Sequence, residues 1–279
     1  MLIEPIKVLG RFEGGGLGEL LRCKDANGVA FAAKFPKDQS ATSQELILDE
    51  ERRFYRHQGA HVVQYFGTIH HTDGRRGFAM ELMQGSLARL LEDGGPIRRG
   101  RAIAYLADAV AGLAEVHQSA QGAYHGDIKP ANILYKDGVA KLADFGLARG
   151  GVGQTQMAGP HNGGTPGYRP PERYTSSAGD VYSLGVTLWA MLAGRNPPVG
   201  GPDTSLTLPP ILADVLNGML AHDPGVRLTT RQLMDKLEPM RRESPDLVKM
   251  LGVAALAGAG TVALVALVGG LLAALFKRK

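Results

Sequence analysis

Four polar residues in the middle of the chain have the types and spacing that chemistry on a phosphate would need. Asp127, Lys129 and Asn132 stand close together, and Asp144 follows twelve residues after the asparagine. Phosphoryl transfer requires a carboxylate that orients the attacking hydroxyl, a cation on the transferring phosphate, and oxygen ligands for Mg²⁺. These four residues supply one such set. The spacing therefore predicts phosphoryl transfer, and the plain structural alternative is a polar turn followed by a strand and another turn.

A glycine-rich turn near the start of the chain is a second candidate for phosphate contacts. Residues 6–33 alternate between apolar and polar patches, which predicts two strands joined by a turn. Glycine lets backbone N–H groups approach a phosphate closely, because no Cβ stands in the way. On this pattern alone, a bland turn and a phosphate-binding turn remain equally open. The residues concerned are Gly14, Gly15, Gly16 and Gly18, with Leu20 just beyond them.

Periodicity predicts the elements that must position these residues. A helix is expected over 43–57, with Ser43 as the candidate N-cap and apolar residues at helical spacing. Two strands flank Asp73-Gly74, which is a good signal for a hairpin. Apolar residues also trace one face of a long helix over 97–118, which delivers the chain to the first of the four polar residues.

Several stretches resemble the eukaryotic-type (Hanks-type) serine/threonine protein kinases. Residues 125–134 are similar to the family's catalytic loop, H-R-D-x-K-x-x-N, and residues 144–146 match its D-F-G motif. The strand that ends at Lys34 resembles V-A-I-K, and residues 164–172 resemble the G-T-x-x-Y-x-A-P-E close of the activation segment. The motifs follow one another in the family's order.

The resemblance covers roughly residues 5–240. Near the end of this range, Arg227 stands where the family has an arginine that pairs with the glutamate of A-P-E, here Glu172. The fold that the resemblance implies is the α+β, two-lobed protein kinase-like fold. A small β-rich N-lobe would occupy about 5–82, and a larger helical C-lobe would occupy about 83–240.

The resemblance also implies a role for each of the four polar residues. Asp127 orients the acceptor hydroxyl and takes its proton, and Lys129 neutralises charge on the γ-phosphate. Asn132 and Asp144 bind Mg²⁺, for which Mn²⁺ could substitute.

ATP is the implied cofactor. Lys34 would hold its α- and β-phosphates and would be braced by a glutamate of the predicted helix. Glu50 is the preferred partner, Glu51 the fallback, and Glu45 a weaker alternative. Ala32, Met80 and Leu134 are the expected walls of the adenine pocket. The implied cofactor-binding residues are therefore Gly14, Gly15, Gly16, Gly18, Leu20, Ala32, Lys34, Glu50, Met80 and Leu134.

Composition bounds the class of protein. The chain has 279 residues, of which 21 % are charged and 44 % hydrophobic, so most of it should be globular. Its net charge of +4 is small for this length and does not argue for nucleic acid as a partner. Cys23 is the only cysteine, which excludes an intrachain disulfide or a cysteine-based zinc site and fits a reducing compartment.

A different composition begins after an expected juxtamembrane linker at 241–250. Residues 251–276 are a 26-residue run without a charge, and a basic tail follows at 277–279. At about 1.5 Å per residue this run spans the ~30 Å core of a lipid bilayer, so a single transmembrane helix is expected. Since ATP is cytosolic, the preceding domain should be cytoplasmic, as in a tail-anchored protein. Small residues four apart, such as Ala254 and Gly258, would permit a homodimer through the helix.

The expected function is ATP-dependent phosphorylation of serine and threonine hydroxyls on protein substrates by a membrane-anchored kinase. The preference for Ser/Thr rests on Lys129, two residues after Asp127, and on Thr165 in the segment that would receive the acceptor. One alternative is a nucleotide-binding pseudokinase that acts as a membrane-tethered scaffold. A small-molecule kinase of related fold is a second, which the activation-segment ending and Arg227 disfavour.

One departure from the family bears on regulation. The arginine that precedes the catalytic aspartate in many members, and binds a phosphate on the activation loop, is Gly126 here. Thr155 is the only Ser or Thr in the loop before Thr165, and Thr165 is expected to face the catalytic loop. We therefore expect activity that depends little on phosphorylation of this loop. Arg149 is the first candidate for a cation that replaces the missing arginine.

Overall fold

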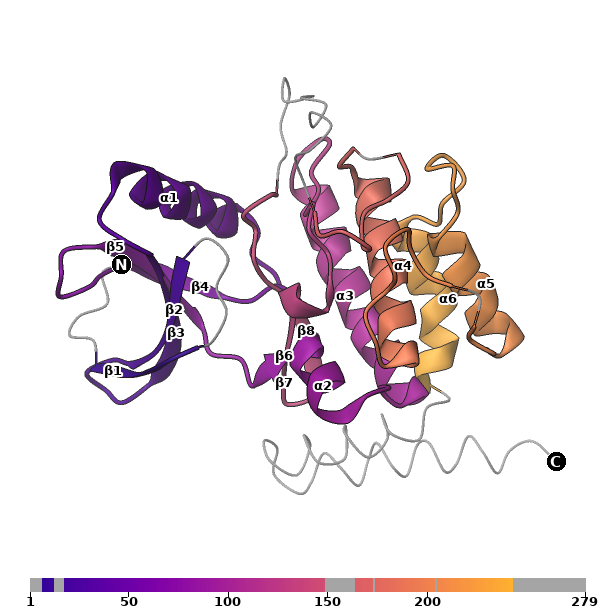
Figure 1. The fold of residues 1–279 in the computed structure, drawn as a ribbon, viewed down its shortest axis with the longest axis horizontal. Coiled ribbons are helices and arrows are strands. Elements are labelled where there is room, and N and C mark those ends of the chain that lie inside the picture. Colours follow the sequence, from indigo (N-terminus) through magenta and orange to yellow (C-terminus); the bar gives the residue numbers. More distant parts are fainter. Residues whose placement is uncertain (1–6, 13–17, 149–163, 173, 204, 243–279) are drawn as a thin grey trace, which may run out of the picture.

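The computed structural model describes residues 7–12, 18–148, 164–172, 174–203 and 205–242. Figure 1 shows two lobes, one built from a sheet with a single helix beside it and the other built mainly from helices. The described part of the chain therefore confirms the two-lobed α+β fold.

The N-lobe contains a five-stranded antiparallel sheet in the order β1-β2-β3-β5-β4. The hairpin between the last two strands turns at Asp73-Gly74, as the sequence predicts. Gly74 has a φ of +90°, which glycine adopts readily because it has no Cβ. The strands are β1 (Lys7–Arg11), β2 (Gly18–Lys24), β3 (Ala30–Pro36), β4 (Tyr65–His70) and β5 (Arg76–Glu81).

The helix of the N-lobe, α1 (Ala41–Arg56), begins earlier than the predicted 43–57. Its N-cap is Ser40, whose Oγ accepts a hydrogen bond from the backbone N–H of Ser43 at 3.2 Å. The prediction of Ser43 as N-cap is therefore wrong. Both serines suit a cap chemically, but only the extended backbone of Ser40 turns its side chain onto the first helical turn.

The C-lobe is helical apart from a small three-stranded sheet in the order β6-β7-β8. The long helix predicted over 97–118 is α3, and it contains thirteen buried residues. Helix α4 packs beside it and is similarly buried, so these two helices form the centre of the lobe (Figure 1). The elements are β6 (Gly85–Ser86), α2 (Leu87–Gly94), α3 (Arg99–Ser119), the 3₁₀ turn η1 (Pro130–Asn132), β7 (Ile133–Lys136), β8 (Val139–Leu142), α4 (Ser177–Ala193), α5 (Pro210–Met219) and α6 (Thr230–Arg242).

The connection from β5 to β6 is three residues long, Leu82-Met83-Gln84. Gln84 fixes its end, because its backbone N–H donates to the carbonyl of Tyr135 at 3.0 Å. Its side-chain amide also exchanges hydrogen bonds of 2.8 and 3.0 Å with Asp137 in the turn after β7. The crossing between the lobes is thus attached to the small sheet, whose strand β7 begins directly after Asn132.

The transmembrane helix predicted at 251–276 and the basic tail at 277–279 lie outside the described residues, as does most of the linker. Among the helices that the structure describes, none has both the length and the apolar character needed to cross a bilayer.

Candidate active site

The loop between α3 and η1 holds a compact network around one carboxylate. Lys129 Nζ donates to Asp127 Oδ2 at 2.8 Å and to Thr165 Oγ1 at 2.7 Å. Thr165 Oγ1 in turn donates to Asp127 Oδ1 at 3.0 Å, and Asn132 Nδ2 donates to Asp127 Oδ2 at 3.0 Å. Both carboxylate oxygens therefore have fixed partners. The expectation that Thr165 faces the catalytic loop is confirmed.

A buried aspartate on α4, Asp180, fixes the backbone that leads into this loop. Asp180 Oδ2 accepts the N–H of His125 at 2.7 Å, and Oδ1 accepts the N–H of Gly126 at 2.8 Å. His117 Nε2 lies 2.9 Å from Oδ2. Asp180 lies in the first turn of the buried helix α4, and only the tertiary contact reveals that it holds a loop more than fifty residues earlier.

The two lobes meet at a chain of charges. Lys34 Nζ lies 2.5 Å from Glu50 Oε1 and 3.9 Å from Asp144 Oδ1. Burial by itself lowers the pKa of Lys34, but the carboxylates of Glu50 and Asp144 outweigh burial and raise that pKa. The partial burial of Asp144 likewise favours its neutral form, yet the charge of Lys34 and the N–H of Gly146 hold the pKa of Asp144 below its usual value. All three groups thus converge on one point between the lobes.

The structure decides among the three candidate glutamates of α1. Glu50 contacts Lys34, whereas Glu51 accepts hydrogen bonds from the Tyr65 hydroxyl at 2.8 Å, the Thr68 hydroxyl at 2.6 Å, and Arg76 Nη2 at 3.0 Å. Successive helical residues project about 100° apart, so the two carboxylates cannot face the same cation. Glu45 is exposed in the second turn of the helix.

The aromatic ring that follows Asp144 is fully buried. Phe145 packs edge-on against Phe54 of α1 at 5.4 Å between ring centroids and lies against His125 at 4.9 Å. His57 stacks on it at 5.1 Å with an interplanar angle of 22°. Burial, together with the neighbouring His125 and Arg56, lowers the pKa of His57 to about 4, so the stacked ring is neutral at pH 7. His57 is a residue that the sequence patterns did not single out.

A family model described as "Protein kinase domain" matches residues 4–237. The chain belongs to the protein kinase family. Since the match covers both lobes, the contacts described above are those of a kinase domain.

Curated relatives of the chain are named as serine/threonine kinases. The chain is 30% identical over 232 residues to the probable serine/threonine-protein kinase zyg-1 of Caenorhabditis briggsae, covering 79% of this chain and 32% of that protein. It is 37% identical over 150 residues to serine/threonine-protein kinase PknL of Mycobacterium tuberculosis, covering 51% of this chain and 37% of that protein. It is 32% identical over 210 residues to serine/threonine-protein kinase AfsK of Streptomyces griseus, covering 70% of this chain and 25% of that protein. The chain thus spans about a quarter to two fifths of the length of these relatives.

The candidate adenine pocket of the kinase domain lies where β3 faces β5. Ala32 pairs with Met80 across the two strands, and both side chains are buried. Leu134 on β7 is partly buried and packs against the same core. The residues predicted for the walls of the adenine pocket therefore lie on both sides of the connection between the lobes: Ala32 and Met80 in the N-lobe and Leu134 in the C-lobe.

Of the glycines in the glycine-rich segment, the structure describes Gly18, which is the first residue of β2. A Cβ on Gly18 would lie 2.6 Å from the carbonyl oxygen of Phe35, so only glycine fits this close approach of β2 to β3. Leu20, two residues on, pairs with Lys34 across the strands. Gly14, Gly15 and Gly16 lie outside the described residues.

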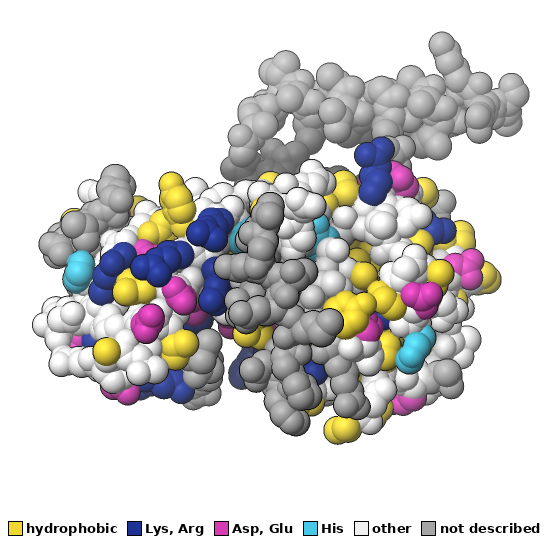
Figure 2. Space-filling model, turned by 90° about the horizontal axis from the view of Figure 1, so that it is seen from above, with side chains coloured by type: hydrophobic (Ala, Val, Ile, Leu, Met, Phe, Trp, Pro, Cys, Tyr) yellow, Lys and Arg dark blue, Asp and Glu magenta, His cyan; other side chains and the backbone are white. Residues whose placement is uncertain are grey.

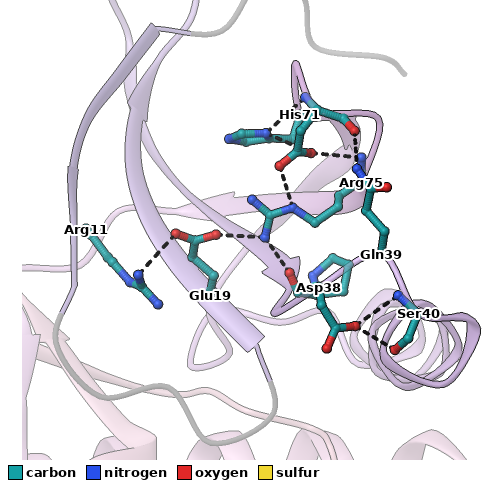
Figure 3. Close-up of polar contacts among 9 residues, drawn as sticks. Arg11, Glu19, Asp38, Gln39, Ser40, His71 and Arg75 are labelled. Carbon is teal, nitrogen blue, oxygen red and sulfur yellow. Dashed lines mark hydrogen bonds and ion pairs between the residues drawn. The ribbon is translucent and has the colours of Figure 1, made fainter.

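A buried arginine ties the start of β2 to the rest of the N-lobe (Figure 3). Arg75 Nη1 donates to Glu19 Oε2 at 2.7 Å and to the carbonyl of Pro36 at 2.5 Å. Its Nε donates to Asp73 Oδ2 at 2.8 Å, and Gln39 Nε2 donates to the carbonyl of the same aspartate at 2.7 Å. The cluster therefore connects the strand after the glycine-rich segment with the loop that leads into α1.

The position before Asp127 offers no side chain and has little room for one. Gly126 has a φ of +86°, and a Cβ there would lie 3.2 Å from the carbonyl oxygen of Leu147. A side chain would be strained in this conformation. The kinase domain therefore holds its catalytic loop through Asp180 and the backbone of Gly126.

An arginine of α1 contacts the segment after Asp144 directly. The Arg53 guanidinium donates from Nη1 to the carbonyl of Gly146 and lies 3.8 Å from Asp49 Oδ2. Figure 2 shows Lys and Arg side chains gathered on the N-lobe face that carries α1. Arg149, the candidate from sequence, lies outside the described residues. Arg53 was missed because it is 93 residues from its partner in the chain.

Metal ligation would fall to Asn132 and Asp144. The amide nitrogen of Asn132 is engaged by Asp127, which directs its amide oxygen elsewhere, and the Asp144 side chain is 44 % exposed. An amide oxygen and a carboxylate oxygen are ligands that Mg²⁺ prefers. Within the described residues there is no group of three or more His, Cys, Asp or Glu side chains that could hold a metal.

Proposed function

We propose that this chain is a membrane-anchored serine/threonine protein kinase that transfers the γ-phosphate of ATP to hydroxyl groups of protein substrates. The observation that carries the proposal is the pair of networks facing each other across the lobes. One joins Asp127, Lys129 and Thr165, and the other joins Lys34 to Glu50. The names of the relatives support the assignment to serine and threonine.

In this proposal each side chain acts on one part of the reaction. Asp127 Oδ1 or Oδ2 accepts a hydrogen bond from the acceptor hydroxyl, orients it for attack and takes its proton as the new bond to the γ-phosphorus forms; the bond from that phosphorus to the bridging oxygen breaks, and ADP leaves. Lys129, which already lies between Asp127 and Thr165, offsets charge on the transferring group. Lys34 holds the α- and β-phosphates, and Asn132 and Asp144 would hold a Mg²⁺ ion, which would offset negative charge on the phosphate oxygens.

The proposal predicts a direct biochemical result. The full chain, purified in detergent with Mg²⁺ and ATP, should phosphorylate serine and threonine peptides and leave a matched tyrosine peptide unmodified. Removing Mg²⁺ with a chelator should stop transfer, because Asn132 and Asp144 can hold phosphate oxygens only through a metal ion, and the charge of those oxygens is then no longer offset. Nucleotide binding without any transfer would instead favour the alternative, a pseudokinase scaffold.

A second prediction concerns activation. Because Gly126 has no side chain and Arg53 links α1 to Gly146 without a phosphate, the arrangement around Asp144 requires no phosphorylated activation loop. Phosphatase-treated enzyme and Thr155→Ala should each retain most of the wild-type rate. The rate is measured on one serine peptide before and after treatment. A large loss that re-phosphorylation restores would contradict this expectation.

A third prediction concerns the membrane. Residues 251–276 contain no charge and are long enough to span a bilayer, so we propose that they anchor the kinase domain on the cytoplasmic side. The full chain should sediment with membranes and resist extraction by high salt, and deletion of 250–279 should release it into the soluble fraction. A full chain that remains in solution without detergent would refute the anchor. A homodimer through Ala254 and Gly258 would appear as cross-linking that disappears with the same deletion.

A further inference from the structure

A small pocket opens beside the catalytic carboxylate of the proposed kinase. The catalytic loop lines it at Gly126 and Ile128, the close of the activation segment at Thr165 and Arg169, and the chain before α4 at Tyr174. Since Asp127 itself also borders the pocket, a hydroxyl oriented by Asp127 would lie at its edge. A substrate chain advances about 3.3–3.6 Å per residue, so the residue next to the acceptor would enter this space.

Several polar groups in the lining are already bonded within the protein. Thr165 Oγ1 contacts Lys129 and Asp127, as described above. Ser183 Oγ donates to the carbonyl of Tyr168 at 2.8 Å, and the Tyr168 hydroxyl donates to Asn196 Oδ1 at 3.0 Å. These groups therefore shape the pocket, and their hydrogen-bonding capacity is already used within the protein.

Arg169 supplies the cation of the pocket. It is exposed, and its Nε donates to the carbonyl of Gly164 at 2.6 Å, which fixes the plane of the guanidinium. No acceptor among the described residues bonds to either terminal nitrogen of Arg169. The Asp127 carboxylate, the acidic group nearby, has its charge offset by Lys129 at 2.8 Å. A planar guanidinium held at one nitrogen presents the geometry that a carboxylate binds best.

We propose that Arg169 selects acceptor sites flanked by an acidic residue. The carboxylate of an Asp or Glu directly next to the substrate Ser or Thr would bind the terminal nitrogens of Arg169 while the hydroxyl lies against Asp127. This inference rests on the proposed function and names its substrate class.

The test compares peptides that differ only beside the acceptor. Two series carry Glu, Gln or Lys on the N-terminal or the C-terminal side of one serine, and kcat/KM is measured with the full chain. Because the pair is partly exposed to solvent, we expect Glu to exceed Gln by about three- to tenfold on one of the two sides. Arg169→Gln should bring that ratio to about one, and Arg169→Glu should shift the preference to Lys.

A matched control is Arg231→Gln, which removes a side chain that is 85% exposed on α6 and should leave the Glu/Gln ratio unchanged.

A wild-type ratio near one on both sides would overturn the inference, as would a ratio that Arg169→Gln does not change. If the Arg169 variants fail to fold, salt serves instead: about 1 M NaCl should reduce the wild-type ratio toward one, and a salt-independent ratio would exclude the charge pair. Absence of transfer to every peptide would overturn the proposed function and not only this inference.

Discussion

Replacing Lys34 with methionine should lower kcat/KM for phosphorylation by at least about a hundredfold, the usual effect of removing a fixed charge that stabilises a transition state. Methionine keeps much of the length of the side chain but cannot bind phosphate oxygens. The substitution also leaves Glu50, which is only 2 % exposed, without its cation. Glu50 then no longer draws α1 toward β3. The measurement is the initial rate of phosphate transfer to a serine peptide at several ATP concentrations.

A matched control for Lys34→Met is Lys37→Met, because Lys37 is exposed just beyond β3. Lys37→Met should retain the wild-type rate, and thermal unfolding should establish that both variants are folded. Asp144→Ala should be as inactive as Lys34→Met, because it removes a proposed metal ligand that lies 3.9 Å from Lys34. A folded Lys34→Met variant with a nearly normal rate would refute the assignment of the phosphate site.

Replacing Arg227 with alanine should lower the free energy of unfolding by about 3–5 kcal/mol, because it leaves the Glu172 carboxylate, whose side chain is only 9% exposed, without its partner. Arg227 Nη1 and Nη2 each lie 2.6 Å from an oxygen of Glu172, and the Arg227 side chain is 0% exposed. Its Nε also donates to the carbonyl of Ala221 at 2.7 Å. For a domain of this size the loss corresponds to a fall in Tm of roughly 10 °C, measured by calorimetry.

Two variants separate the loss of a contact from the burial of an unpaired charge. Arg231→Ala, which removes an exposed pair with Asp235 at 3.6 Å, should change the free energy of unfolding by less than about 0.5 kcal/mol. Combining Arg227→Met with Glu172→Leu should recover much of the stability, since apolar side chains of similar volume often replace a buried ion pair without loss. An Arg227→Ala variant as stable as the wild type would show that Glu172 finds other partners.

The two-lobed fold and the order of its parts follow from local patterns. A hairpin at Asp73-Gly74 needs only a turn that glycine can form, and α3 needs only apolar residues at helical spacing. The N-cap of α1 was misplaced by three residues because Ser40 and Ser43 are equally suitable in sequence. Backbone conformation, which the sequence pattern does not specify residue by residue, decides between them.

Within the site, the sequence by itself determined which residue types are present and their spacing along the chain: Asp127, Lys129 and Asn132 in one loop, and Asp144 beyond it. It left Glu50 and Glu51 open as partners of Lys34, because neighbouring positions of one helix differ only in the direction they face. Only the packing of α1 on the sheet decided for Glu50.

The tertiary structure alone also provided the contacts between residues far apart in the chain. Asp180 holds the backbone before Asp127, His57 stacks on Phe145, and Arg53 reaches Gly146. None of these pairs has a spacing that a helix or a strand would produce, so no periodic pattern could reveal them. They form because folding brings the surfaces of α1, the catalytic loop and α4 together, and the hydrogen-bonding groups buried there must find partners.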